Sequence, residues 1–139
     1  MTIEPREFHT AIATLTRVRA DLVEIHYKPG CTLAIPEMAE VQAMRRRIMG
    51  TTPYGMITFI PGDIDFELPT MQVDHLETDR KEGQVIATAV VARAHMIEML
   101  VKLYFSYFPQ LHRVRVTDNE QEARAWLDAQ LGESMRTGS

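Results

Sequence analysis

The stretch Val114-Arg-Val-Thr-Asp-Asn-Glu-Gln-Glu-Ala-Arg-Ala-Trp-Leu127 joins a short strand pattern directly to a helix pattern. Thr117 and Glu120 have the spacing of a capping box, in which a hydroxyl and a carboxylate three residues apart satisfy each other's free backbone N–H groups. The residues that follow form one apolar stripe, at Ala123, Trp126, Leu127 and Leu131. The stretch therefore predicts that the fold closes with a strand and a capped amphipathic helix.

Upstream of this stretch, strand patterns and helix patterns alternate. Strands are expected at residues 11–18, 22–27, 54–60, 85–91 and 112–116, and helices at residues 36–49, 69–81, 94–108 and 119–131. The first two strands are close enough for an antiparallel hairpin, and the later alternation implies right-handed crossovers between parallel strands. The predicted class is α/β: a single-domain mixed, mostly parallel β-sheet of four to five strands with an N-terminal hairpin and about four helices. The domain is expected to span residues 11–131, with tails at 1–10 and 132–139.

Composition narrows the classes of partner. The chain has 139 residues, of which 45% are hydrophobic and 24% charged, which suits one globular domain. A formal net charge of -4 argues against a nucleic-acid partner. Cys31 is the only cysteine and residues 1–9 lack the apolar run of a signal peptide, so a cytoplasmic location is expected. No apolar run reaches the roughly 18 residues of a membrane span, so no integral membrane segment is expected.

The order of elements resembles the STAS group of small domains, which includes the SpoIIAA-like anti-sigma factor antagonists. It is similar to small bacterial domains of unknown function described as STAS-like. Three stretches carry the resemblance, namely Leu22-Val-Glu-Ile-His-Tyr-Lys-Pro-Gly30, the segment from Ala87 through Phe105, and the closing stretch 114–127. The resemblance implies a mixed sheet of four or five strands with helices packed against it. It also implies a domain that binds proteins, nucleotides or lipids and often pairs as a dimer.

One family feature is missing. Anti-sigma factor antagonists of this group carry a phosphorylatable serine in the loop after the third strand. The corresponding stretch here, Phe59-Ile-Pro-Gly-Asp-Ile-Asp-Phe-Glu-Leu-Pro-Thr70, contains no serine. Thr70 is the available substitute, but it follows several acidic side chains that would repel a phosphate. A kinase-operated switch is therefore not expected.

Charged and metal-ligating side chains offer weaker candidates. Asp63 and Asp65, with Glu67 and Asp74, could hold a divalent cation or act as general acid and base, although a solvated acidic loop is the simpler interpretation. The five histidines lack the spacing of a helical zinc site, and neither a metal nor a cofactor is expected. The run 45–47 and the pair Arg113 and Arg115 could bind an anion, but we expect solvated charge.

The predicted helix 94–108 has more apolar surface than one sheet face requires. The excess comes from aromatic side chains near its C-terminal end, which could be buried, line a pocket or contact another chain. The leading hypothesis is a non-enzymatic regulatory or binding domain that self-associates, most simply as a homodimer, and binds a protein or small ligand. The alternative is a binder of an apolar small ligand or lipid, and a third is a small enzyme using Asp63, Asp65 and His75. The candidate ligand-binding residues are Asp63, Asp65, Thr70, Tyr104, Phe105 and Phe108.

Overall fold

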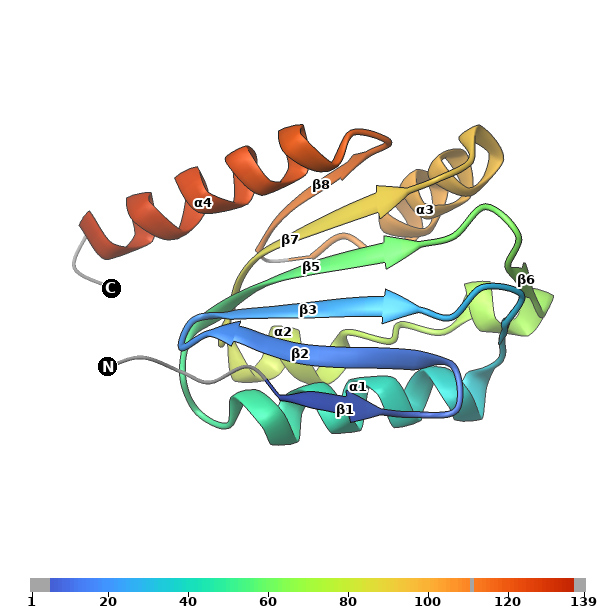
Figure 1. Ribbon diagram of the computed structural model, residues 1–139, viewed down its shortest axis with the longest axis horizontal. Coiled ribbons are helices and arrows are strands. Elements are labelled where there is room, and N and C mark those ends of the chain that lie inside the picture. Colours follow the sequence, from blue (N-terminus) through green and yellow to red (C-terminus); the bar gives the residue numbers. More distant parts are fainter. Residues whose placement is uncertain (1–5, 111, 137–139) are drawn as a thin grey trace.

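The structure is a computed structural model that describes residues 6–110 and 112–136. Figure 1 shows a twisted sheet with one helix on one face and the other helices on the opposite face. In chain order, the elements are β1 (Glu7–His9), β2 (Ala13–Arg19), β3 (Leu22–Tyr27), β4 (Thr32–Leu33), α1 (Ile35–Met49), β5 (Tyr54–Ile60), β6 (Asp65–Phe66), the 3₁₀ helix η1 (Leu68–Gln72), α2 (Glu77–Glu82), β7 (Val85–Ala92), α3 (His95–Tyr107), β8 (Arg113–Thr117) and α4 (Glu120–Arg136).

The main sheet is mixed and mostly parallel, as predicted. Its six strands lie in the order β1-β2-β3-β5-β7-β8, with antiparallel pairing at β1-β2 and β2-β3 and parallel pairing from β3 onward. The prediction of four to five strands missed β1, a three-residue edge strand whose Phe8 lies opposite Leu15. Its length and polar ends leave little pattern to detect. Regular structure therefore extends into the ranges 1–10 and 132–139 that were predicted as tails.

A second, two-stranded sheet lies beyond the main one. It pairs β4 with β6 in parallel, through bonds from the Asp65 N–H to the Cys31 carbonyl at 2.9 Å and from the Glu67 N–H to the Leu33 carbonyl at 3.0 Å. These bonds tie the chain after β3 to the chain after β5. Both segments leave the carboxyl ends of parallel strands, where open α/β sheets usually bind ligands.

Among the described residues, α4 is the helix that covers one face of the sheet. Its Leu127 and Leu131 pack so closely on β5 that a side chain at Gly55 would have its Cβ 3.0 Å from both. The helix begins one residue after Asn119, whose side-chain oxygen accepts the Glu122 N–H at 3.0 Å. The predicted capping pair, Thr117 and Glu120, is therefore wrong by two residues. Asn119 caps the helix in place of Thr117 because it directly precedes the first helical turn.

The opposite face carries α1, α2 and α3, and here the expected helix 69–81 is wrong. The chain instead forms η1, an irregular link and the short helix α2. The hydroxyl of Tyr104 accepts the His75 N–H and donates to the Val73 carbonyl, both at 2.8 Å. The Asp74 side chain accepts the Leu76 N–H at 3.2 Å. Because these side chains satisfy the backbone of the link, it gains no hydrogen bonds by becoming helical.

Candidate functional site

An apolar pocket of about 130 Å³ lies between the sheet and the helices α1 and α3. Strands β3, β5 and β7 supply its floor, and β4, β6 and η1 close it near the carboxyl ends of those strands. The lining consists of Ile25, Tyr27, Leu33, Met38, Gln42, Met56, Thr58, Ile60, Ile64, Phe66, Thr70, Met71, His75, Leu76, Thr88, Val90, Ile97, Leu100, Val101, Tyr104 and Phe105. Such a concave, mainly apolar lining with a few polar groups is typical of small-molecule sites.

The pocket explains the packing of α3. The inner face of this helix is apolar, yet Ile97 is the one side chain of His95–Tyr107 that is fully buried. Leu100, Val101, Tyr104 and Phe105 are partly exposed and line the pocket, and three of them, Leu100, Val101 and Phe105, also pack against the edge of the core. The excess apolar surface predicted for this helix is therefore divided between a pocket wall and the solvent.

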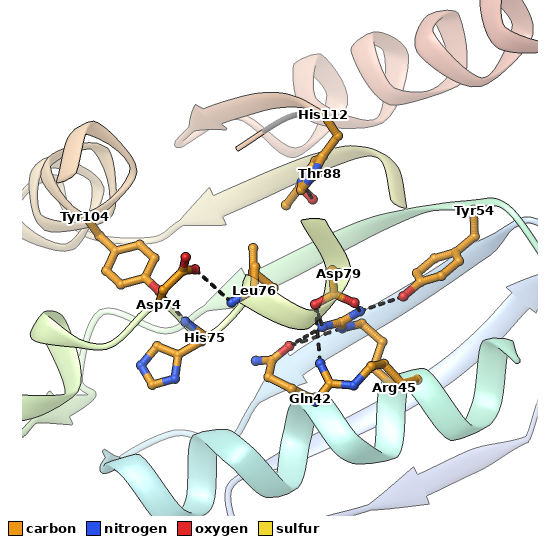
Figure 2. Close-up of polar contacts among 11 residues, drawn as sticks. Gln42, Arg45, Tyr54, Asp74, His75, Leu76, Asp79, Thr88, Tyr104 and His112 are labelled. Carbon is orange, nitrogen blue, oxygen red and sulfur yellow. Dashed lines mark hydrogen bonds and ion pairs between the residues drawn. The ribbon is translucent and has the colours of Figure 1, made fainter. Parts of the chain in front are cut away.

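Polar groups at the end of the pocket near η1 are bonded to the protein. Figure 2 shows the ring of Tyr104 beside His75, with ring centroids 5.9 Å apart. The His75 Nε2 lies 2.8 Å from the Thr70 carbonyl oxygen. Burial raises the pKa of Tyr104 to about 12, so its hydroxyl stays protonated and can donate to the Val73 carbonyl. The side chains at this end of the pocket are thus held in place by hydrogen bonds to the backbone.

The predicted ligand-binding residues separate into two groups. Thr70, Tyr104 and Phe105 line the pocket, whereas Asp63 and Asp65 are exposed and lie outside its lining. Phe108 is also outside the lining and packs on the Tyr104 ring, with centroids 5.1 Å apart.

Two chemical roles considered for this region find no support in the geometry. Thr70 is only 3% exposed and donates its hydroxyl to the Leu33 carbonyl at 2.8 Å, so a kinase could not reach it. His75 lines the pocket, but Asp63 and Asp65 do not share it. The structure therefore does not bring together the three residues of the hypothetical acid–base site. Among residues 6–110 and 112–136, no three side chains of His, Cys, Asp or Glu gather as metal ligands.

A buried ion pair borders the pocket. Arg45 of α1 is fully buried and makes two bonds of 2.7 Å to the carboxylate of Asp79 in α2. Its other donors bond the Gln42 side-chain oxygen, at 3.1 and 2.6 Å, and the Tyr54 hydroxyl of β5 (Figure 2). The prediction of solvated charge is wrong for Arg45. Its position four residues after Val41 and four before Met49, both buried, was the available signal.

We predict that Asp79→Asn destabilises the protein by about 3–5 kcal/mol, because it leaves the buried Arg45 charge uncompensated. Urea denaturation would measure the change in the free energy of unfolding. The matched control is Asp128→Asn, which breaks the exposed ion pair with Arg19 and should cost less than about 1 kcal/mol. Equal losses in the two variants would contradict the structural role of the buried pair.

His112 contacts the part of the pocket lining that β7 supplies. Its Nε2 is 2.8 Å from the hydroxyl of Thr88, a pocket-lining residue of β7. Burial lowers the pKa of His112 to about 4, and the nearby positive charges of Arg45 and Arg80 act in the same direction. The imidazole is therefore neutral at pH 7, and its pairing with Thr88 does not place a charge beside the pocket.

This pKa predicts a pH-dependent stability. Because the unfolded chain takes up a proton near pH 6.5 and the folded His112 only near pH 4, stability is complete above pH 6.5 and falls as the pH drops toward 4. Between pH 6.5 and pH 4, the free energy of unfolding should fall by about 1–2 kcal/mol less in His112→Gln than in the wild type. Urea denaturation at a series of pH values measures this difference. His9→Gln, at an exposed edge histidine, is the control and should keep the loss of stability that His112 causes. If stability fell with pH equally in the wild type and in His112→Gln, His112 would not be the source of the pH dependence.

Comparisons with known proteins identify the fold. The chain is similar to the crystal structure of an uncharacterised protein from the DUF3478 family, which has a SpoIIAA-like fold and comes from Shewanella loihica PV-4. The TM-score is 0.54 and the identity 11%, over 91% of this chain and 94% of that chain. No protein-family model and no curated protein sequence matches this chain. The fold is thus SpoIIAA-like, as the sequence resemblance implied. Within the described residues, no helix is both long and apolar enough to cross a membrane.

Proposed function

We propose that this chain is a non-enzymatic binding domain whose ligand is a small apolar molecule held in the pocket between the sheet and α3. The observation that carries the proposal is the pocket itself, a space of about 130 Å³ with an almost entirely apolar lining. An engineered apolar cavity of roughly 150 Å³ stays dry and binds benzene, so this pocket has room for a molecule of about that size. A longer lipid would fit only in part.

The chemistry of the lining supports binding over catalysis. No Asp, Glu, Lys or Arg lies among the described residues that line the pocket, and His75 is their one histidine. Its Nε2 is 2.8 Å from the Thr70 carbonyl oxygen, so this ring nitrogen is bonded to the protein backbone. General acid–base catalysis needs a titratable group within reach of the reacting atoms. A cytoplasmic location belongs to this proposal too, since Cys31 is a free thiol.

Toluene is a suitable probe of the pocket. At ten times its dissociation constant, a ligand of the folded state adds about 1.4 kcal/mol of stability, which corresponds to a rise in Tm of about 3–6 °C. Val101→Phe should abolish the toluene-induced rise, because the larger side chain fills the pocket from α3. Differential scanning calorimetry with and without toluene measures the rise in Tm for the wild type and for the variant.

The matched control for this experiment is Leu103→Phe, which adds a ring to the exposed side of the same helix. It should keep the full toluene-induced rise. An unchanged Tm in wild-type protein, both at saturating toluene and at saturating p-cresol, its hydroxylated analogue, would refute the proposed function. Native mass spectrometry of freshly purified protein would then show whether a different apolar compound accompanies the chain.

A second candidate function, self-association, is supported by the outer face of α3. Four exposed apolar side chains follow each other at spacings of three or four residues and so form one stripe, with exposed fractions of 70% for Met96, 57% for Met99, 48% for Leu103 and 71% for Tyr107. The stripe is nearly symmetric about its centre. Two antiparallel copies of α3 would therefore place Met99 beside Leu103 and Met96 beside Tyr107, as a two-fold interface requires.

Charge favours the same arrangement. The acidic and basic residues of α3 are Glu98 and Lys102, which pair with each other at 2.9 Å. Because the helix has no net charge from these groups, two copies would not repel each other across the stripe. We therefore propose a second copy of this chain as the occupant of the stripe.

Size-exclusion chromatography with light scattering tests the association. We expect the average mass to rise with concentration over about 1–100 µM, and Leu103→Glu to weaken the dimer more than tenfold, because the two-fold axis buries the new charge twice. Ala129→Glu is the control, since it adds the same charge to an exposed position on α4. A wild-type mass that stays monomeric at every concentration would exclude the dimer and leave the pocket proposal intact.

A further inference from the structure

We propose that the ligand of this pocket is a neutral molecule with one hydroxyl or carbonyl group, and that the Thr58 hydroxyl binds this group on the pocket floor. This inference rests on the proposed function, since it concerns the same pocket, and it names the class of ligand: small phenols, cyclic alcohols or ketones in place of plain hydrocarbons.

The position of Thr58 is the first observation. It lies in the middle of β5, a central strand, between Ile25 of β3 and Val90 of β7. Since side chains alternate along a strand, Thr58 shares the pocket face with Met56 and Ile60. A hydroxyl there is surrounded by apolar neighbours. Thr58 nevertheless stays partly exposed, because the pocket extends down to the sheet.

The second observation is that the other polar side chains of the lining already have partners in the protein. Two of them are threonines, of which Thr70 donates to the Leu33 carbonyl and Thr88 lies 2.8 Å from His112 Nε2. The remaining bonds join Tyr27 to the Met38 sulfur, Gln42 to Arg45, His75 to the Thr70 carbonyl and Tyr104 to the Val73 carbonyl. Thr58 is the exception: its hydroxyl has no hydrogen bond to any residue within 6–110 and 112–136.

This unpaired hydroxyl selects between ligands. A hydrocarbon that fills the pocket would remove the Thr58 hydroxyl from water without replacing its hydrogen bond, and a buried polar group left unpaired is costly. A ligand with a hydroxyl or carbonyl restores that bond. Sites that contain a polar group for a substrate hydroxyl reject analogues that lack it, for the same reason.

The ligand should also be uncharged. Within the described part of the chain no acidic or basic side chain lines the pocket, and the nearest buried cation, Arg45, is saturated by Asp79, Gln42 and Tyr54. A carboxylate or an ammonium group in this pocket would therefore lose its hydration without gaining a counter-charge. One neutral donor or acceptor matches the single free hydroxyl.

Calorimetric titration of p-cresol and toluene tests the inference, because the two probes differ by one hydroxyl. We expect Thr58→Val, which keeps the shape of the side chain, to weaken p-cresol binding about 5- to 20-fold and to leave toluene binding unchanged or tighter. Thr58→Ser keeps the hydroxyl and should retain most of the affinity for p-cresol. Thr16→Val, on the opposite face of the sheet, is the control and should change neither probe.

The outcomes separate the two proposals. If wild-type protein binds toluene but Thr58→Val leaves p-cresol binding unchanged, or weakens both probes equally, the inference is wrong and the apolar pocket remains. If wild-type protein binds neither probe, the proposed function fails and the inference fails with it. A thermal melt shows that each variant is folded before titration, and valine suits a central strand.

Discussion

The ion pair between Arg45 and Asp79 is the constraint on which the pocket side of this fold depends. Two charges removed from water are stable only when nearly every donor and acceptor is satisfied. Here the Arg45 guanidinium bonds Asp79, Gln42 and Tyr54, which lie on three different elements, α2, α1 and β5. The pair therefore fixes α2 against α1 near the amino-terminal end of β5 (Figure 2). The segment between β5 and β7, which closes the pocket, is held at this end by charge.

The same segment is held at its middle by one tyrosine. Tyr104 of α3 bonds the backbone at Val73 and His75, while the β4–β6 pair ties the start of the segment to the chain after β3. Between these attachments the segment has little regular structure and few buried side chains. Hydrogen bonds and an ion pair, more than apolar packing, thus hold the segment that covers the pocket. The opposite face shows the contrast, since α4 packs directly on the sheet through Ala123, Leu127 and Leu131.

The sequence predicted the elements that have strong periodicity and missed those that depend on side-chain bonds. Residues 54–60 and 85–91 were predicted as strands because both are mostly apolar runs of strand length, and both match the structure closely. The expected helix 69–81 was wrong because Tyr104, some 30 positions away along the chain, supplies bonds to its middle. Arg45 was missed for a related reason: a charge run suggests a solvated face unless the partner, Asp79, is known in advance. The apolar end of α3 was foreseen as a wall or an interface, but only the tertiary structure separates the two faces.

A pocket of this size has an energetic cost that the fold tolerates. Side chains that line a pocket of about 130 Å³ make fewer close contacts than side chains of a packed core. In this structure α3 cannot move inward freely, because Tyr104 is fixed to the link at Val73–His75 and Ile97 already rests in the core. The polar bonds that hold the cover therefore also hold the pocket open. A ligand that fills the space and meets the Thr58 hydroxyl recovers both the packing and the hydrogen bond that the folded chain lacks, which is the thermodynamic reason to expect one.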